Sequence, residues 1–252
     1  MKFIDLSHEL KNDTEVYPGD LKFKLWNIND KNEDYSLFEL KGNLHTGTHI
    51  DAPYHQIANG KKVKNLLLEN LIGIANVFDV KPLSPNKEIN LEDIHTLNKI
   101  YQKKYSVDHE LKKIYQKKYS VDHELKNELK KIIILKTGWC DNWSEENYFT
   151  ENPFISKEVA KIFVENNISG IAIDTPSVDP FGEDKIHKIL LKNNIWIVEN
   201  LTNMNKINEG IHKVFFIPLN IDADASFIRA FIEIPEILTH IKNNDGNQIK
   251  KD

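Results

Sequence analysis

Short apolar segments recur between residues 72 and 198 of this chain, and they constrain its fold more than any other feature. Each is four to nine residues long and rich in Ile, Val and Leu: residues 72–80, 131–136, 170–174 and 195–198. Segments this short and this apolar are typical of buried strands. Between two of them, residues 156–166 place Val159, Ile162 and Phe163 on one helical face, beginning at Ser156. Buried strands that alternate with helices predict an α/β fold.

Further strands are expected near both ends of the chain. The early candidates are residues 3–10, 22–28 and 36–40, and the late ones are residues 215–219 and 227–234. Residues 22–28 alternate apolar and polar side chains, which predicts a half-buried strand. The early strands have a more antiparallel character, so we expect a mixed β-sheet in a single α/β domain over residues 1–252.

An internal duplication interrupts this pattern. Residues 100–113 recur immediately as residues 114–127, and only the last position differs, Lys113 against Asn127. Fourteen residues are two heptads, so the duplication preserves the phase of a helix. We therefore predict an extra helical insertion around residues 100–128. It is either a surface elaboration or, through its apolar stripe, a contact with a partner or another subunit.

Composition excludes several functional classes. The 252 residues are 28% charged with a net charge of −5, and the lysines are interleaved with acidic residues, so no nucleic-acid partner is expected. The longest purely apolar run is too short to cross a bilayer, and no signal peptide is visible, so no membrane partner is expected. Cys140 is the only cysteine, which excludes an intramolecular disulfide. A cytoplasmic location is the simplest expectation, with Cys140 as a packing residue.

Three histidines and an aspartate lie within eleven residues, in the segment His-Thr-Gly-Thr-His-Ile-Asp-Ala-Pro-Tyr-His at positions 45–55. Imidazole and carboxylate groups are ligands for zinc, manganese or iron. A fully extended chain would hold His45 and His49 roughly 13 Å apart, too far to share an ion. Gly47 would ease a turn, and Pro53 would return Ala52 to an extended form. We therefore expect His45, His49 and Asp51 to point at one metal site.

The same segment meets every fixed position of the pattern H-x-G-T-H-x-D-A-P-x-H and so resembles the cyclase family, which includes metal-dependent kynurenine formamidases. The resemblance covers most of the chain. Residues 5–7 and 17–20 resemble the opening segment of the family, and residues 174–179 resemble its second block. The family then places a histidine and, twelve residues later, a glutamate, which His187 and Glu199 match.

The resemblance implies a role for each of these residues. His45, His49, Asp51, His187 and Glu199 would hold two divalent metal ions per subunit, Zn²⁺ or Mn²⁺, with Asp51 and Glu199 bridging. His55 would transfer a proton rather than bind metal. Tyr17 would line the substrate pocket where kynurenine formamidases tend to carry Trp, and Trp26 or Phe38 could also stack on the substrate. The implied fold is a swivelling β/β/α domain, and the implied assembly is a homodimer or homotetramer.

Without the resemblance, some of these residues have plainer explanations. His187 lies in a Lys-rich segment and would be taken for a surface histidine, whereas Glu199 ends a buried strand and is a better candidate on its own. Asp174 and Asp179 flank Pro176 and could simply form a turn.

Three functions remain open from the sequence. The first is hydrolysis of a small linear amide, N-formylkynurenine to kynurenine and formate, in tryptophan catabolism. The second keeps the metals but changes the substrate to a cyclic amide such as isatin, because Tyr17 replaces the Trp of the family. The third is a non-catalytic metal-binding protein, which the single cysteine and the spare histidine, His55, both disfavour.

Overall fold

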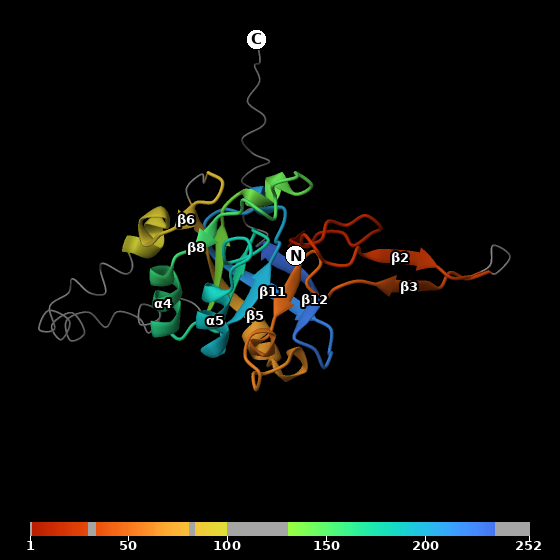
Figure 1. The fold of residues 1–252 in the computed structure, drawn as a ribbon. Helices are drawn as coiled ribbons and strands as arrows, with labels where there is room; N and C mark the ends of the chain where they lie inside the picture. The colour runs from red at the N-terminus through yellow and green to blue at the C-terminus, as the bar shows by residue number, and fades with distance from the viewer. Residues whose placement is uncertain (1, 30–33, 81–83, 100–130, 235–252) are drawn as a thin grey trace, which may run out of the picture.

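The computed structural model describes residues 2–29, 34–80, 84–99 and 131–234 (Figure 1). Its strands are β1 Lys2–Asp5, β2 Lys24–Asn27, β3 Phe38–Lys41, β4 His49–Asp51, β5 Ile72–Asp79, β6 Glu88–Ile89, β7 Ile132–Lys136, β8 Phe154–Ile155, β9 Gly170–Ile173, β10 Trp196–Glu199, β11 Gly210–Pro218 and β12 Ala225–Ile234. Its α-helices include α1 Leu68–Leu71, α4 Lys157–Glu165 and α5 Lys185–Lys192.

One eight-stranded sheet organises the described residues, in the order β1-β12-β11-β5-β7-β9-β10-β4. The four strands β5, β7, β9 and β10 run parallel to their neighbours in that group, whereas the remaining pairings are antiparallel. Strand β4 pairs with β12 as well as with β10, so the sheet closes on itself. The expected mixed α/β fold with a mixed sheet is therefore confirmed.

The parallel strands are mostly apolar because most of their residues are buried on both faces of the sheet. On one face, Ile133, Ile171 and Ile197 pack into a core that includes Phe163 of α4 and Leu190 of α5. On the other face, alternate residues of the same strands pack into a second core, which includes Ile134, Ala172 and Val198. Figure 1 shows α4 and α5 together on one side of the sheet. The side chains on that side are the ones from which the candidate site is built.

Helix α4 forms where the sequence predicts it. The Ser156 hydroxyl accepts a hydrogen bond from the backbone N–H of Val159 at 3.3 Å, as an N-cap residue does. Val159, Ile162 and Phe163 are buried on one face of the helix. The hydrophobic periodicity and the capping residue together are thus sufficient to locate this helix.

Strands β2 and β3 form where strands were expected, but β2 is more exposed than predicted. They pair only with each other and project away from the main sheet as a hairpin (Figure 1). Residues 22–28 were expected to form a half-buried strand, but every residue of β2 except Leu25 is exposed. The prediction holds for Phe23, which is buried and packs edge-on against Phe227, whereas within β2 only Leu25 is partly buried.

The duplicated segment, residues 100–127, and the predicted helical insertion around it lie outside the described residues. Among the residues that are described, no helix has both the length and the apolar content needed to cross a membrane.

Candidate metal centre

The histidine-rich segment folds as a turn followed by an extended strand. Gly47 adopts φ +63°, a conformation that glycine reaches without steric cost, and Ala52 before Pro53 is extended. Both features agree with the sequence-based expectation. Between them, β4 places His49 and Asp51 on the same face of the sheet, because they are two residues apart. Ile50 points the other way, into the second core.

Strand pairing then brings the carboxylate of Glu199 to His49. Strands β4 and β10 are antiparallel, and Glu199 is directly opposite His49 in their register. Cross-strand neighbours share a face and lie within side-chain contact. Glu199 Oε2 and Asp51 Oδ1 each lie 3.5 Å from His49 Nε2. Residues separated by 150 positions in the sequence thus converge on one buried point.

Helix α5 contributes His187 to the same cluster. Its Nε2 atom lies 3.2 Å from Glu199 Oε1 and 3.4 Å from Asp51 Oδ2. The carboxylate of Asp179 accepts hydrogen bonds from the backbone N–H groups of Ile186 and His187, and its Oδ2 atom lies 2.8 Å from His187 Nδ1. Asp179 therefore anchors the first turn of α5 and holds the imidazole by one nitrogen, leaving the other directed at the cluster.

His49 is oriented in a similar way by the turn that precedes it. Its Nδ1 atom lies 2.9 Å from the Gly47 carbonyl oxygen, which also accepts a hydrogen bond from the side-chain amide of Asn200. The Thr48 hydroxyl donates to the Asn200 carbonyl oxygen at 2.6 Å. These bonds join the turn to the end of β10. They leave Nε2 of His49 as the nitrogen that faces the two carboxylates.

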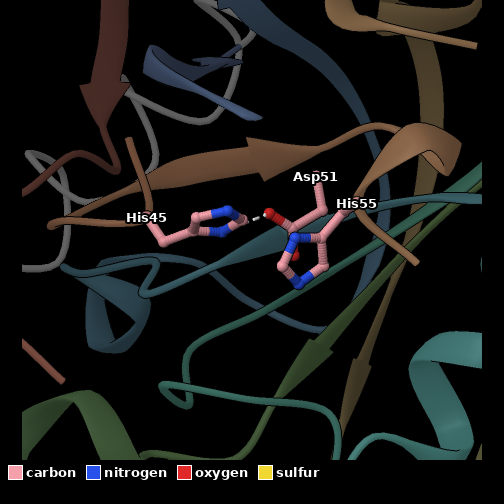
Figure 2. A group of neighbouring side chains, drawn as sticks. All are labelled: His45, Asp51 and His55. Atoms are coloured by element: carbon pink, nitrogen blue, oxygen red, sulfur yellow. Dashed lines mark ion pairs between the residues drawn. The ribbon is translucent and has the colours of Figure 1, made fainter. Parts of the chain in front are cut away.

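His45 and His55 complete the cluster at its more exposed edge. Nδ1 of His45 lies 2.8 Å from Asp51 Oδ1, the contact drawn in Figure 2, and the ring centroids of His45 and His55 are 4.3 Å apart. Two groups of possible metal ligands result, one formed by His49, Asp51 and Glu199 and one by His45, Asp51 and His55. Asp51 belongs to both groups and therefore connects them.

Three buried atoms indicate that the cluster is built to receive a cation. His49 Nε2 and both carboxylate oxygens of Asp51 have no hydrogen-bond partner within the described part of the chain. Buried polar atoms are nearly always paired, because leaving them unpaired costs roughly 1–3 kcal/mol each. A divalent ion between the imidazole and carboxylate groups would satisfy all three atoms. Imidazole nitrogen and carboxylate oxygen also suit zinc and manganese, so the residues fit the metal ions that the sequence implies.

Mutual electrostatic stabilisation shifts the pKa values in the cluster. Burial by itself would lower the pKa of His45, but the carboxylates of Asp51 and Asp224 raise it to about 10. The pKa of His187 is also raised well above its ordinary value against the effect of burial, chiefly by Glu199 and Asp179. Conversely, the histidines hold the pKa values of Asp51 and Glu199 below their ordinary values although burial opposes this. Both carboxylates are therefore ionised and suited to metal binding.

Tyr17 lies against the loop that leads from β9 to α5. Its ring stacks on Phe181 with centroids 5.2 Å apart and meets Phe149 edge-on at 6.1 Å. Its hydroxyl accepts a hydrogen bond from the Gly182 N–H at 3.0 Å. The residue thus presents an aromatic surface, and its hydroxyl oxygen accepts one hydrogen bond while its O–H remains able to donate. Trp26 and Phe38 lie instead on the β2–β3 hairpin, outside the sheet that carries the cluster.

Asp179 and Asp224 were not among the site residues predicted from the sequence. Asp179 was taken as a possible turn-former, and only the path of α5 shows that it holds His187. Asp224 contacts both His45 and His55, but no pattern separates it from the neighbouring Asp222. The carboxylate of Asp174 does not act within its own segment but accepts hydrogen bonds from the backbone N–H groups of Thr137 and Gly138, just after β7. Cys140 is buried, as expected of a packing residue.

Several known proteins are similar to this chain in sequence or in fold. The sequence profile of the Cyclase family matches residues 4–180. The chain is 30% identical over 238 residues to a kynurenine formamidase of Bacillus anthracis, an alignment that covers 92% of this chain and 97% of that protein. A kynurenine formamidase of Bacillus cytotoxicus is 25% identical over 236 residues with the same coverage.

Two solved structures share the fold at lower sequence identity. A predicted metal-dependent hydrolase from Bacillus stearothermophilus superposes with a TM-score of 0.66 at 21% identity, covering 92% of this chain and 97% of that one. Isatin hydrolase A from Labrenzia aggregata superposes with a TM-score of 0.68 at 18% identity, covering 93% and 94%.

Proposed function

The chain belongs to the cyclase family, and we propose that it is a metal-dependent hydrolase that converts N-formylkynurenine to kynurenine and formate. One observation carries the proposal: two groups of ligand atoms that share Asp51 meet in a buried cluster, with His55 at its edge. The names of relatives aligned over 92% of the chain supply the substrate class.

Two divalent ions would be held by His45, His49, Asp51, His187 and Glu199, whose imidazole and carboxylate groups accept zinc or manganese. When bound, such ions lower the pKa of water and stabilise negative charge on a carbonyl oxygen. The chain itself supplies the fixed geometry. The hydrogen bonds that Asp179 and Gly47 make to the ring Nδ1 atoms of His187 and His49 keep each Nε2 atom directed at the carboxylates.

Hydrolysis of the formamide requires a proton at the departing nitrogen. Water adds to the formyl carbon, the carbon–nitrogen bond breaks, and the products are formate and the aryl amine. An amide anion is a very poor leaving group, so the nitrogen must be protonated as it departs. The exposure of His55 supports this role, because its side chain is 26% exposed whereas those of His187 and Asp51 are 8% and 1% exposed.

We place the aryl ring of the substrate against the aromatic surface formed by Tyr17, Phe149 and Phe181. Aromatic rings pair favourably at centroid separations of 4.5–7 Å, so this surface suits a flat aryl group. The Tyr17 hydroxyl oxygen accepts from the Gly182 N–H, and its own O–H remains able to donate a hydrogen bond to the substrate.

A cyclic amide is the second candidate substrate. Isatin hydrolase A has the same fold, and Tyr17 stands where kynurenine formamidases tend to carry Trp. Ring opening of isatin and deformylation both begin with attack of water on an amide carbonyl, so the same cluster would serve either reaction.

A substrate panel separates these functions. Purified protein loaded with zinc or with manganese should release formate from N-formylkynurenine with kcat/KM at least about tenfold above that for isatin opening. The reverse preference would support the cyclic amide. Bound metal without turnover of any amide in the panel would leave only the non-catalytic function. Elemental analysis of the same sample identifies the metal and its stoichiometry.

The remaining features are also proposals. We propose a homodimer or homotetramer, which is supported by the exposed apolar side chains of the β2–β3 hairpin, including Phe38 and Leu40. The buried free thiol of Cys140 is compatible with a reducing compartment, and we propose the cytoplasm. We retain the swivelling β/β/α arrangement as the detailed description of the fold, with a single domain.

A further inference from the structure

We infer that Asp224 is a positioning residue that holds the imidazoles of His45 and His55 on a single carboxylate oxygen. Asp224 Oδ2 lies 3.1 Å from His45 Nε2 and 3.2 Å from His55 Nδ1. The inference rests on the proposed function, because it concerns the residue that transfers the proton. It extends that function to a side chain outside the H-x-G-T-H-x-D-A-P-x-H segment.

The backbone of Asp224 is fixed to the segment that carries the cluster. Its carbonyl oxygen accepts a hydrogen bond from the Ala52 N–H at 2.8 Å, and the next residue, Ala225, pairs with Asp51 across β12 and β4. One residue earlier, the Ala223 carbonyl accepts from the Val63 N–H at 2.9 Å. The backbone that carries the Asp224 carboxylate is therefore held in place beside Asp51, as a positioning residue requires.

The chemistry of the contact fixes which nitrogen of His55 is free. An ionised carboxylate can only accept hydrogen bonds, so His55 must donate its Nδ1–H to Asp224. Neutral His55 then carries its lone pair on Nε2, the atom that takes up and delivers the proton. By the same reasoning His45 donates from Nε2, and its Nδ1 atom, 2.8 Å from Asp51 Oδ1, is left to bind metal. One carboxylate thus sets the tautomer of both a ligand and the proton-transfer residue.

Asp222 provides a matched control on the same loop. It lies two residues before Asp224, but its carboxylate faces outward and pairs with Lys62 at 2.9 Å and Lys64 at 3.2 Å. Asp222→Asn removes the same charge from the same loop without touching either imidazole.

A double-mutant cycle in metal-loaded enzyme tests the inference. We expect Asp224→Asn to lower kcat for N-formylkynurenine about tenfold or more at saturating metal, and Asp222→Asn to leave kcat unchanged. In a His55→Ala background, Asp224→Asn should cause a smaller further decrease in kcat, because the part of its effect that passes through His55 is lost and only the part that passes through His45 remains. An equal decrease in both backgrounds would overturn the inference.

A spectroscopic readout separates this inference from the proposed function. In zinc-loaded protein, long-range ¹H–¹⁵N spectra should show His55 protonated on Nδ1, with its signals assigned by their loss in His55→Ala. Asp224→Ala should change that tautomer and Asp222→Ala should not, because alanine, unlike asparagine, has no oxygen to accept the Nδ1–H. Protonation of His55 on Nε2 in the unmodified protein overturns the inference. Absence of formamide turnover, with the tautomer still dependent on Asp224, would instead overturn the substrate and leave the positioning role intact.

Discussion

At the residue scale, His55 has two possible roles that its position alone leaves open. It lies with His45 and Asp51 in one of the two groups of potential ligands, and it also stands at the exposed edge where a proton would be transferred. A general acid contributes to turnover, whereas a ligand contributes to metal binding, so one substitution can separate the two roles.

We expect His55→Ala to lower kcat by roughly 10²-fold or more while metal content stays at the level of the unmodified protein. Steady-state kinetics and elemental analysis of the same preparation measure both quantities. His212→Ala, on β11 outside the cluster, serves as the control and should change neither quantity. Loss of metal in the His55 variant would make His55 a ligand.

For Glu199 we expect the opposite result: its substitution should lower the metal content, which His55→Ala should leave unchanged. It is buried between His49 and His187, and its Oε1 atom also accepts a hydrogen bond from the Val178 N–H at 3.0 Å. Glu199→Gln keeps the shape and an acceptor for Val178 but removes the charge that balances a cation. We expect at least one equivalent of metal to be lost, measured by elemental analysis after dialysis. Unchanged metal content together with unchanged activity would remove Glu199 from the site.

At the element scale, the position of Glu199 depends on how β10 packs against β9. Gly170 is the register partner of Trp196, and a Cβ atom on Gly170 would lie 2.0 Å from Trp196 Cε2. Trp196 is buried and packs in the second core, so its ring cannot move aside without cost. The absence of a side chain at residue 170 is therefore a packing requirement of this strand pair.

Gly170→Ala should destabilise the protein by about 1–3 kcal/mol through overpacking, as measured by denaturant unfolding. Gly73→Ala is the matched control in the same sheet, because its Cβ atom would meet nothing closer than Ile132 Cδ1 at 3.8 Å. Equal unfolding free energies for the two variants would show that Trp196 can relocate.

The β2–β3 hairpin is the second element whose packing calls for an explanation. Two strands alone are marginally stable in water, and Phe38 and Leu40 are 57% and 58% exposed. Covering these side chains with another subunit would stabilise the hairpin and bury apolar surface.

We expect Phe38→Ser combined with Leu40→Ser to shift the protein to a smaller assembly, measured by light scattering coupled to size exclusion. Leu68→Ser, which removes another exposed apolar side chain on α1, should leave the mass unchanged. A monomeric unmodified protein would contradict the proposed oligomer directly.

At the scale of the whole molecule, the metal ions would link the two halves of the chain. The cluster joins the loop before β4, strand β4 itself, helix α5 and the end of β10, which are segments about 140 residues apart in sequence. A ligand that binds only the folded form stabilises it, by about 2.7 kcal/mol at a free concentration one hundred times its Kd.

Chelation followed by dialysis should therefore lower the melting temperature by roughly 5–10 °C, and adding zinc or manganese should restore it. Differential scanning calorimetry measures both changes. The same treatment of a His49→Ala variant should have a much smaller effect, since His49 is a proposed ligand. An equal shift in the variant would place the stabilising metal elsewhere.

Much of this architecture follows from local patterns. The buried strands β5, β7, β9 and β10 and the helix α4 lie where periodicity and the Ser156 cap predict them, because both faces of a parallel strand must be apolar. Strand β4 was not distinguished as a strand, since three residues are too few for a period, although the turn at Gly47 was expected.

The sequence by itself determined the ligand types and one half of the cluster, because His49 and Asp51 are separated by two residues and any extended strand puts them on one face. Only the tertiary structure decided what faces them. The register of β4 against β10 sets Glu199 opposite His49, and Asp179 turns His187 inward from α5. Asp224 joins the cluster for the same reason, since strand closure between β4 and β12 is a long-range pairing that no local spacing encodes.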